Sequence, residues 1–262
     1  MRKRNKNAVT MTPEESRKII GSKLSFAAAE AYKLLRTNLT FSVPGNQCRI
    51  IGVTSSLQAE GKSITSVNIA YTLAQAGQKV LLLEADLRLP TAAKRLRLRA
   101  KPGLSNILVG QTGLEDAVQP SKMIDNLDVI TGGEVPPNPA ELLGSAQMKE
   151  LLKILSVRYD TIIVDLPPVK VVSDAMIISK LVSGYVMVVR QNVCDKGSLD
   201  EVIRQMEFVD AKILGFVVTG ADYQQKSYKH YGRYGHYGYY GSHERYRYAA
   251  QATAQEKQDK KV

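Results

Sequence analysis

Residues 49–76 constrain the fold of this chain more than any other part of the sequence. The apolar residues 50–53 have the composition of a buried strand, and residues 55–61 form a polar turn that ends in glycine. Lys62 and Ser63 follow, and beyond them apolar residues recur at helical spacing. The apolar face of that helix would be formed by Val67, Ala70, Tyr71 and Ala74. The sequence therefore predicts a strand, a turn that carries G-K-S, and a helix.

This order of elements is the structural context of a phosphate-binding P-loop. The N–H groups of such a turn and of the helix start converge on an anionic phosphate. We expect Lys62 to reach the terminal phosphates and the Ser63 hydroxyl to bind Mg²⁺. Because Ser56 stands where the motif has its first glycine, the match is imperfect and needs support from other residues. The residues predicted to bind the phosphates are Ala59, Glu60, Gly61, Lys62, Ser63 and Ile64.

Two further apolar runs end in acidic residues. VLLLEADLRLP, residues 80–90, places Glu84 and Asp86 after four apolar residues, and YDTIIVDLPP, residues 159–168, places Asp165 in the same way. Ligands bind at the carboxyl ends of strands in open α/β sheets. A strand-end aspartate can also serve only a turn or a helix cap. Downstream of a P-loop, however, Asp86 and Asp165 are candidates for Mg²⁺ binding and for a general base.

Strand-like and helix-like segments alternate through the rest of the chain. We expect strands at 127–133, 184–189 and 213–218, helices at 145–157, 173–182 and 197–209, and short helices within 101–125. Such alternation predicts an α/β fold with a mostly parallel, twisted sheet and helices on both faces.

The net charge of +11 is concentrated at the two ends of the chain. Residues 1–23 hold seven basic and two acidic side chains, and residues 226–262 hold eight and three, so each end carries +5. We interpret residues 1–23 as a basic, mostly disordered segment, 24–222 as the folded domain and 223–262 as a disordered tail. Basic ends could attract nucleic acid or an anionic membrane surface, or could simply be solvated.

Tyrosine is concentrated in the tail, where residues 223–248 hold nine of the thirteen tyrosines of the chain. Glycine recurs among them, as in HYGRYGHYGYYG, which disfavours a helix or a packed strand. We therefore expect flexible, exposed hydroxyl groups, although an aromatic, basic segment could also bind nucleic acid or itself. The candidate phosphate acceptors are Tyr228, Tyr231, Tyr234, Tyr237, Tyr239 and Tyr240.

Near the N-terminus, residues 25–41 have a helical pattern. Glu30, Lys33 and Arg36 recur on one face of this predicted helix. The simplest interpretation of such a stripe is a solvated helix face. The chain has no run of 18 apolar residues and only two cysteines, Cys48 and Cys194, which together lead us to expect a protein of the reducing cytoplasm.

In these residues the chain resembles the bacterial tyrosine kinases of capsular and exopolysaccharide biosynthesis, in particular the separate cytoplasmic ATPase subunit of Gram-positive bacteria. The resemblance rests on AEGKS, LLLEADLRLP, IIVDLPP, PPNPAELL, the Glu30 helix and the tyrosine cluster. It implies a P-loop fold of the deviant Walker type, related to partition ATPases. It also implies ATP and Mg²⁺ as cofactors, and Lys62, Asp86 and Asp165 as catalytic residues, with Ser63, Asp86 and Asp165 near the metal.

The same resemblance implies the partners of the chain. They are a transmembrane activator, a phosphotyrosine phosphatase and further copies of the chain in a ring, with Glu30, Lys33 and Arg36 at the subunit contact. Nucleic acid is not an expected partner. The chain would lie in the cytoplasm at the inner face of the membrane and phosphorylate tail tyrosines of a neighbouring subunit, thereby regulating polysaccharide polymerisation and export.

The sequence departs from the family pattern at four places. Gln58-Ala59 replaces Pro-Gly in the loop, Glu84 replaces the first aspartate of the second strand motif, and Lys33 replaces an arginine. Thr219 stands where related ATPases have an asparagine that contacts adenine. These differences bear on nucleotide affinity and on ring assembly.

Two other functions fit the sequence less well. A partition or division-site ATPase would carry a signature lysine five residues before Lys62, where this chain has Leu57, and would lack a tyrosine tail. A non-enzymatic adaptor with an aromatic, basic tail would leave the P-loop and the acidic strand ends unexplained.

Overall fold

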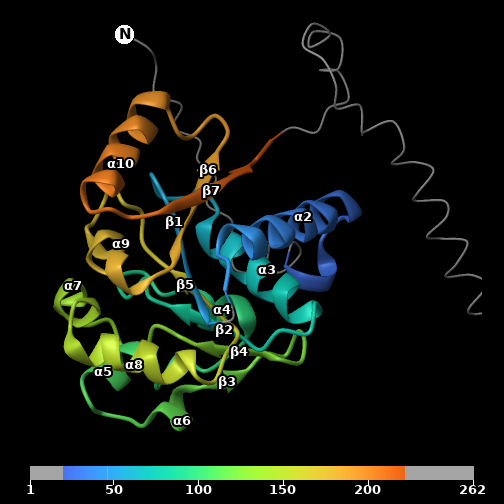
Figure 1. The fold of residues 1–262 in the computed structure, drawn as a ribbon. Coiled ribbons are helices and arrows are strands. Elements are labelled where there is room, and N and C mark those ends of the chain that lie inside the picture. Colours follow the sequence, from blue (N-terminus) through green and yellow to red (C-terminus); the bar gives the residue numbers. More distant parts are fainter. Residues whose placement is uncertain (1–19, 46, 222–262) are drawn as a thin grey trace, which may run out of the picture. The chain divides into compact units, whose positions relative to one another are not determined.

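The strand that precedes the P-loop lies inside a seven-stranded sheet (Figure 1). The computed structural model describes residues 20–45 and 47–221. The strand order is β3-β4-β2-β5-β1-β6-β7, and only β3 runs antiparallel to its neighbour. The strands are β1 (Arg49–Ser55), β2 (Val80–Glu84), β3 (Gln119–Pro120), β4 (Leu127–Ile130), β5 (Thr161–Asp165), β6 (Gly184–Arg190) and β7 (Ile213–Thr219).

Helices cover both faces of this sheet (Figure 1). One apolar cluster joins the sheet to α2 and α3, and another joins its opposite side chains to α5, α8 and α10. The longer helices are α2 (Phe26–Ser42), α3 (Lys62–Gln75), α8 (Ala146–Ser156) and α10 (Lys196–Phe208). The shorter ones are η2 (Gly21–Lys23), α4 (Ala92–Leu96), α5 (Leu104–Leu108), α6 (Leu114–Ala117), α7 (Pro139–Leu143), α9 (Asp174–Ile177) and η3 (Ser179–Leu181).

The register of the central strands aligns their carboxyl ends. Asp165 is level with Val53 of β1 on one side and with Glu84 of β2 on the other. The acidic ends of β2 and β5 therefore flank the point where β1 leads into the P-loop. The predicted α/β fold, with its mostly parallel sheet and helices on both faces, is confirmed.

The structure differs from the sequence-based expectations in three segments. Residues 20–23 were placed in the N-terminal segment, but the Ile20 side chain is buried and the Gly21 N–H donates to Asn68 of α3 over 2.9 Å. Within 101–125 the two short helices α5 and α6 are followed by β3, an edge strand that was not predicted. The helix expected at 173–182 is interrupted, because α9 ends at Ile177 and a 3₁₀ turn follows.

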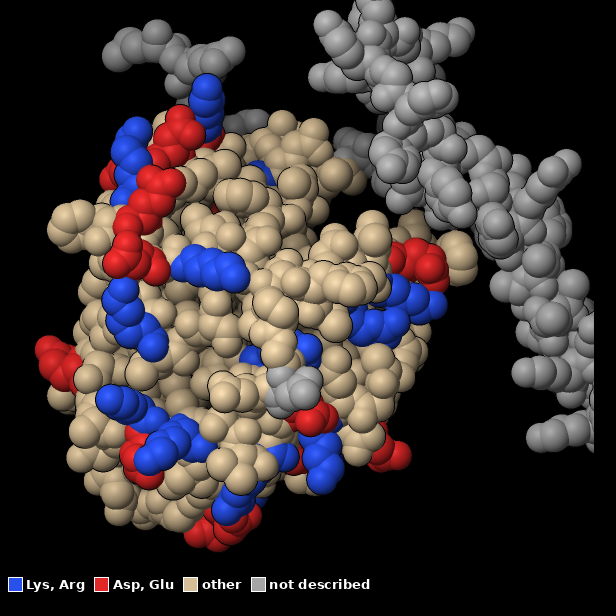
Figure 2. Space-filling model, in the orientation of Figure 1, with Lys and Arg blue, Asp and Glu red and all other residues tan. Residues whose placement is uncertain are grey.

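Charge is mixed rather than segregated on the face that Figure 2 shows, where Lys and Arg side chains lie among Asp and Glu side chains. Cys48 and Cys194 are partly buried free thiols, and burial raises the pKa of Cys48 to about 11. In the part of the chain described, no helix combines the length and the apolarity that crossing a bilayer requires.

Candidate active site

The loop between β1 and α3 has the backbone shape of an anion site. Ala59 and Gly61 both adopt positive φ angles, 62° and 94°, so the chain turns sharply just before the helix. The N–H groups of Lys62, Ser63 and Ile64 form the first turn of α3 and have no acceptor within the helix. Unpaired donors and the positive end of the helix dipole together favour a bound phosphate.

Lys62 is the cation of this site. Its Nζ lies 2.6 Å from Asp86 Oδ2 and 3.9 Å from Asp165 Oδ1. Burial acts to lower the pKa of Lys62, but the charges of Asp165 and Asp86 outweigh it and raise that pKa. The lysine is therefore protonated at any physiological pH and ready to neutralise a phosphate.

Asp165 is enclosed at the end of β5. Burial raises its pKa, whereas the charge of Lys62 and hydrogen bonds from Ser63 and Ser66 oppose that increase. Ser66 Oγ, one turn into α3, is 3.1 Å from Asp165 Oδ1. A buried carboxylate of this kind needs a nearby cation to remain charged, and Lys62 supplies one.

The donor atoms around Lys62 suit a magnesium ion. Ser63, Asp86 and Asp165 bring a hydroxyl group and two carboxylates to the loop. No cluster of three or more His, Cys, Asp or Glu side chains that could hold a metal is found in residues 20–45 and 47–221. Mg²⁺ is usually held by one or two carboxylates together with waters and the phosphates of the substrate. The residues present therefore fit Mg²⁺ bound together with a nucleotide.

Glu84, the first acidic residue of the β2 motif, turns its carboxylate toward backbone N–H groups. Oε1 accepts from Thr91 and from Ala92, the latter over 2.6 Å, and Oε2 accepts from Gly132 over 2.8 Å. Burial raises the pKa of Glu84 to about 7, although these hydrogen bonds act to lower it. Glu84 thus fastens the start of α4 and the loop after β4.

Sequence reasoning missed an ion pair beside the site. Arg88, two residues after Asp86, donates to both carboxylate oxygens of Asp174 over 2.9 and 3.0 Å. Asp174 is fully buried at the start of α9, so this bidentate pair ties the loop after β2 to that helix. The only signal in the sequence was an arginine within a motif, and the partner is 86 residues away.

Arg190 and Thr219, at the ends of β6 and β7, also hydrogen-bond to the P-loop. Arg190 was not singled out from the sequence, and Thr219 was noted only as a departure from the family pattern. Their donors reach the loop backbone at Ala59 and Glu60, 131 and 159 residues away.

Glu30, Lys33 and Arg36 of α2 make contacts within their own chain. Glu30 and Lys33 form an exposed ion pair of 2.6 Å. The Arg36 guanidinium donates to the Thr72 carbonyl oxygen of α3 over 3.0 Å, so part of its hydrogen-bonding capacity is used within the chain. The predicted acceptor tyrosines, 228 to 240, lie outside the described residues.

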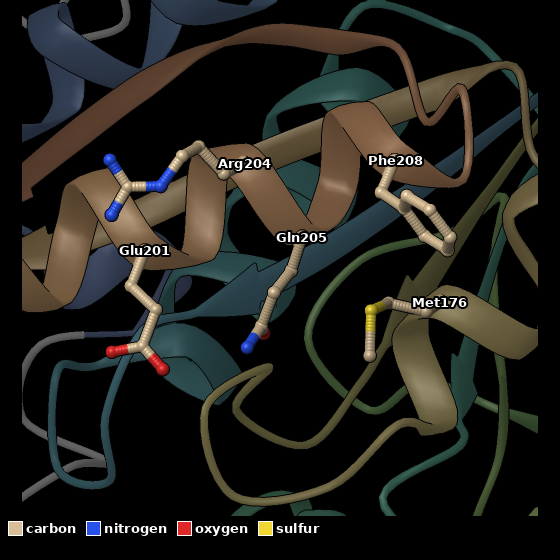
Figure 3. Close-up of a pocket in the computed structure, with 5 residues that line it drawn as sticks. All are labelled: Met176, Glu201, Arg204, Gln205 and Phe208. Carbon is tan, nitrogen blue, oxygen red and sulfur yellow. The ribbon is translucent and has the colours of Figure 1, made fainter.

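A shallow pocket of about 400 Å³ lies elsewhere, between α9 and α10 (Figure 3). The Phe208 ring and the Met176 side chain face each other across it, and Glu201, Arg204 and Gln205 complete its lining. None of the predicted site residues contributes to it.

Comparisons with known proteins identify similar chains. A family described as AAA domain matches residues 48–213. The tyrosine-protein kinase YwqD of Bacillus subtilis (strain 168) is 38% identical over 199 residues, which cover 76% of this chain and 84% of that protein. The tyrosine-protein kinase CpsD of Streptococcus agalactiae is 34% identical over 213 residues, which cover 80% and 92% of the two chains.

Solved structures show the same relationship. The kinase domain of the Escherichia coli tyrosine kinase ETK superposes with a TM-score of 0.75 at 30% identity and covers 90% of this chain and 89% of that one. The chimerical protein CapA2B2 gives 0.72 at 32% identity, with 78% and 88% covered. The septum site-determining protein MinD complexed with Mg-ADP, from Pyrococcus horikoshii OT3, gives 0.55 at 24% identity, with 65% and 70% covered, and shows a shared fold.

Proposed function

The chain belongs to the bacterial tyrosine-protein kinases of the YwqD and CpsD kind, and on this basis we propose that it transfers the γ-phosphoryl group of ATP to tyrosines of its own C-terminal segment. The acceptors would be Tyr228, Tyr231, Tyr234, Tyr237, Tyr239 and Tyr240, on a neighbouring copy of the chain. The observation that carries this proposal is the ion cluster of Lys62, Asp86 and Asp165 at the start of α3.

Phosphoryl transfer requires charge neutralisation and in-line positioning more than covalent chemistry. The N–H groups at the start of α3 would hold the phosphates, and Lys62 would neutralise their charge. Ser63, Asp86 and Asp165 would hold Mg²⁺, which supplies further positive charge to the phosphate oxygens when bound.

The tyrosine hydroxyl must lose a proton as its oxygen bonds to the γ-phosphorus. The bond between that phosphorus and the β,γ-bridging oxygen breaks, and ADP leaves. A tyrosine pKa near 10 makes a general base useful. We assign this role to Asp86, because its carboxylate is the closest one to Lys62.

We further propose that the kinase works in a ring at the inner face of the membrane. The solved structure of a chimerical protein CapA2B2 supports a partner chain, for which we propose a transmembrane activator. Phosphates would make the basic C-terminal segment acidic and favour disassembly, and a phosphotyrosine phosphatase would reset it. The cycle would regulate polymerisation and export of a capsular polysaccharide or exopolysaccharide.

The test is a lysine substitution with a matched control. Lys62→Met should abolish phosphotyrosine formation from Mg-ATP, because it removes the cation that pairs with Asp86 and Asp165 at the start of α3. Lys153→Met removes an exposed lysine of α8 and should leave the rate unchanged. Phosphotyrosine is measured with a specific antibody and by mass spectrometry, and circular dichroism reports the fold. A folded Lys62→Met protein that phosphorylates itself normally would refute the proposal.

A further inference from the structure

The P-loop is held from outside by residues of β6 and β7. Arg190 Nη1 donates to the Ala59 carbonyl oxygen over 3.0 Å, and Thr219 Oγ1 donates to the Glu60 carbonyl oxygen over 2.7 Å. These are the two consecutive carbonyl groups that precede Gly61 and Lys62. Side chains at the ends of β6 and β7 therefore hold the loop directly before the start of α3.

The side chain of Glu60 completes this attachment. It is fully buried, and Oε2 accepts the Leu57 N–H over 2.6 Å while Oε1 accepts the Arg190 N–H over 3.3 Å. One carboxylate thus closes the loop on itself and joins it to the end of β6. A buried carboxylate satisfied by two backbone donors is a rigid anchor.

Peptide geometry gives these contacts a consequence for phosphate binding. In a planar trans peptide the C=O and the N–H point in opposite directions. When Arg190 holds the carbonyl of Ala59, the N–H of Glu60 must point away from Arg190. When Thr219 holds the carbonyl of Glu60, the N–H of Gly61 must likewise point away from Thr219. The two side chains therefore fix the direction of two loop N–H groups.

The conformation of the loop makes such fixing necessary. Ala59 has a φ of 62°, which an alanine adopts only at an energetic cost, and Gly61 at 94° is free to rotate to other angles. Residues of this kind need outside contacts to persist in one conformation. The strand ends are themselves joined, since the Gln191 N–H donates to the Thr219 carbonyl oxygen over 2.9 Å.

We propose that Arg190 and Thr219 are positioning residues that preorganise the P-loop for nucleotide phosphates, an inference that rests on the proposed function of the loop as the ATP site. Thr219 therefore acts on the nucleotide through the loop backbone. Its hydroxyl holds the peptide between Glu60 and Gly61 in one orientation. Less conformational entropy is then lost when a nucleotide binds, so the affinity for the nucleotide is higher.

The experiment compares three threonine variants. Thr219→Val keeps the branched shape and removes the hydroxyl, whereas Thr219→Ser keeps the hydroxyl. The control, Thr161→Val, removes a buried hydroxyl that does not contact the loop and donates to Gln78 Oε1 over 2.8 Å. Binding of a fluorescent ADP analogue with Mg²⁺, the KM for ATP, kcat and the Tm without nucleotide are measured for each full-length chain.

Thr219→Val should weaken binding and raise KM about 5–10-fold, the effect of one lost hydrogen bond, with kcat changed less than about twofold. Thr219→Ser should restore both values. Thr161→Val should lower Tm without changing KM. Wild-type affinity in Thr219→Val, or a lower Tm as its only effect, would overturn the positioning role.

The binding assay separates the two proposals. A wild-type protein that binds Mg-ADP but forms no phosphotyrosine would refute the kinase proposal while the variants still decide the positioning role. Normal phosphorylation with unchanged affinity in Thr219→Val would refute the positioning role alone. A wild-type chain that binds no nucleotide would refute both.

Discussion

Lys62 forms ion pairs with both Asp86 and Asp165 at the start of α3. All three side chains are largely buried, and removing one partner of a buried ion pair typically costs about 3–5 kcal/mol because a charge is left uncompensated. Lys62 alone is paired with both carboxylates in these two ion pairs. A phosphate that takes Lys62 as its counter-ion would leave the carboxylates to a second cation such as Mg²⁺, so we expect the metal and the phosphate to bind together.

The carboxylates can be tested one at a time. Asp86→Asn and Asp165→Asn should each lower the phosphorylation rate by at least ~10²-fold, because each removes a positioned charged group from the reaction centre. Asp210→Asn is a suitable control, since Asp210 is exposed and pairs only loosely with Lys180, over 3.4 Å. Initial rates at saturating Mg-ATP are compared with the same acceptor chain. Near wild-type rates in both site variants would remove the strand-end carboxylates from the mechanism.

The strand β1, which leads into the P-loop at the carboxyl end of the sheet, is tightly packed against β6. Gly52 faces the ring of Tyr185 in β6, and a Cβ at this position would lie 2.6 Å from two ring carbons. Tyr185 is fully buried and its hydroxyl donates to the Ala175 carbonyl oxygen. The ring is therefore fixed at both ends and cannot easily move aside.

Gly52→Ala should lower the free energy of unfolding by about 1–3 kcal/mol, the usual cost of overpacking a filled core. Gly197→Ala lies in α10 with only the flexible Asp195 side chain close by, and should be neutral or stabilising by up to about 1 kcal/mol. Urea denaturation of both variants measures the difference. Equal stabilities would show that β1 and β6 have more room than the structure indicates.

The strands and long helices could be predicted because their apolar patterns are local. The P-loop and the acidic ends of β2 and β5 could be placed together, since parallel strands bring their carboxyl ends to one edge. The two-residue strand β3 could not be predicted, because it exists only through pairing with β4. Its sequence, Gln119–Pro120, has no strand signal of its own.

The sequence indicated which residues would lie together at the candidate site, but not all of their contacts. Lys62, Asp86 and Asp165 were recognised by their motifs, and the structure brings them together. Glu84 occurs in the same motif as Asp86, and no sequence pattern shows that its carboxylate turns toward α4. The contact between Thr219 and Glu60 spans 159 residues and depends on the order of the strands.

On the scale of the whole molecule, the predicted ring depends on α2. The Glu30–Lys33 pair is exposed and contributes little to the stability of one chain, so both residues can be removed with small effect on folding. Arg36 also contacts α3 of its own chain, which makes its substitution more consequential.

Replacing Glu30, Lys33 and Arg36 together by alanine should abolish large assemblies and lower phosphotyrosine in parallel. Replacing only Glu30 and Lys33 leaves the bond between Arg36 and Thr72 intact. If α2 is the subunit contact, this double variant should still lose most of the large assemblies and most of the phosphotyrosine. Light scattering gives the mass, and phosphotyrosine is measured on the same samples. Variants that assemble and phosphorylate like the parent would rule out α2 as the subunit contact.

The most direct test of the kinase proposal mixes two variants, neither of which can phosphorylate itself. One chain carries Lys62→Met and an intact C-terminal segment, and the other has an intact site but phenylalanine in place of all nine tyrosines between residues 223 and 248. After incubation with Mg-ATP, phosphopeptides are located by mass spectrometry. Transfer in trans predicts phosphate on the Lys62→Met chain, at tyrosines between 228 and 240, and none when either chain is incubated alone. An unmodified Lys62→Met chain in the mixture, beside an unmixed wild-type chain that phosphorylates itself, would contradict the account.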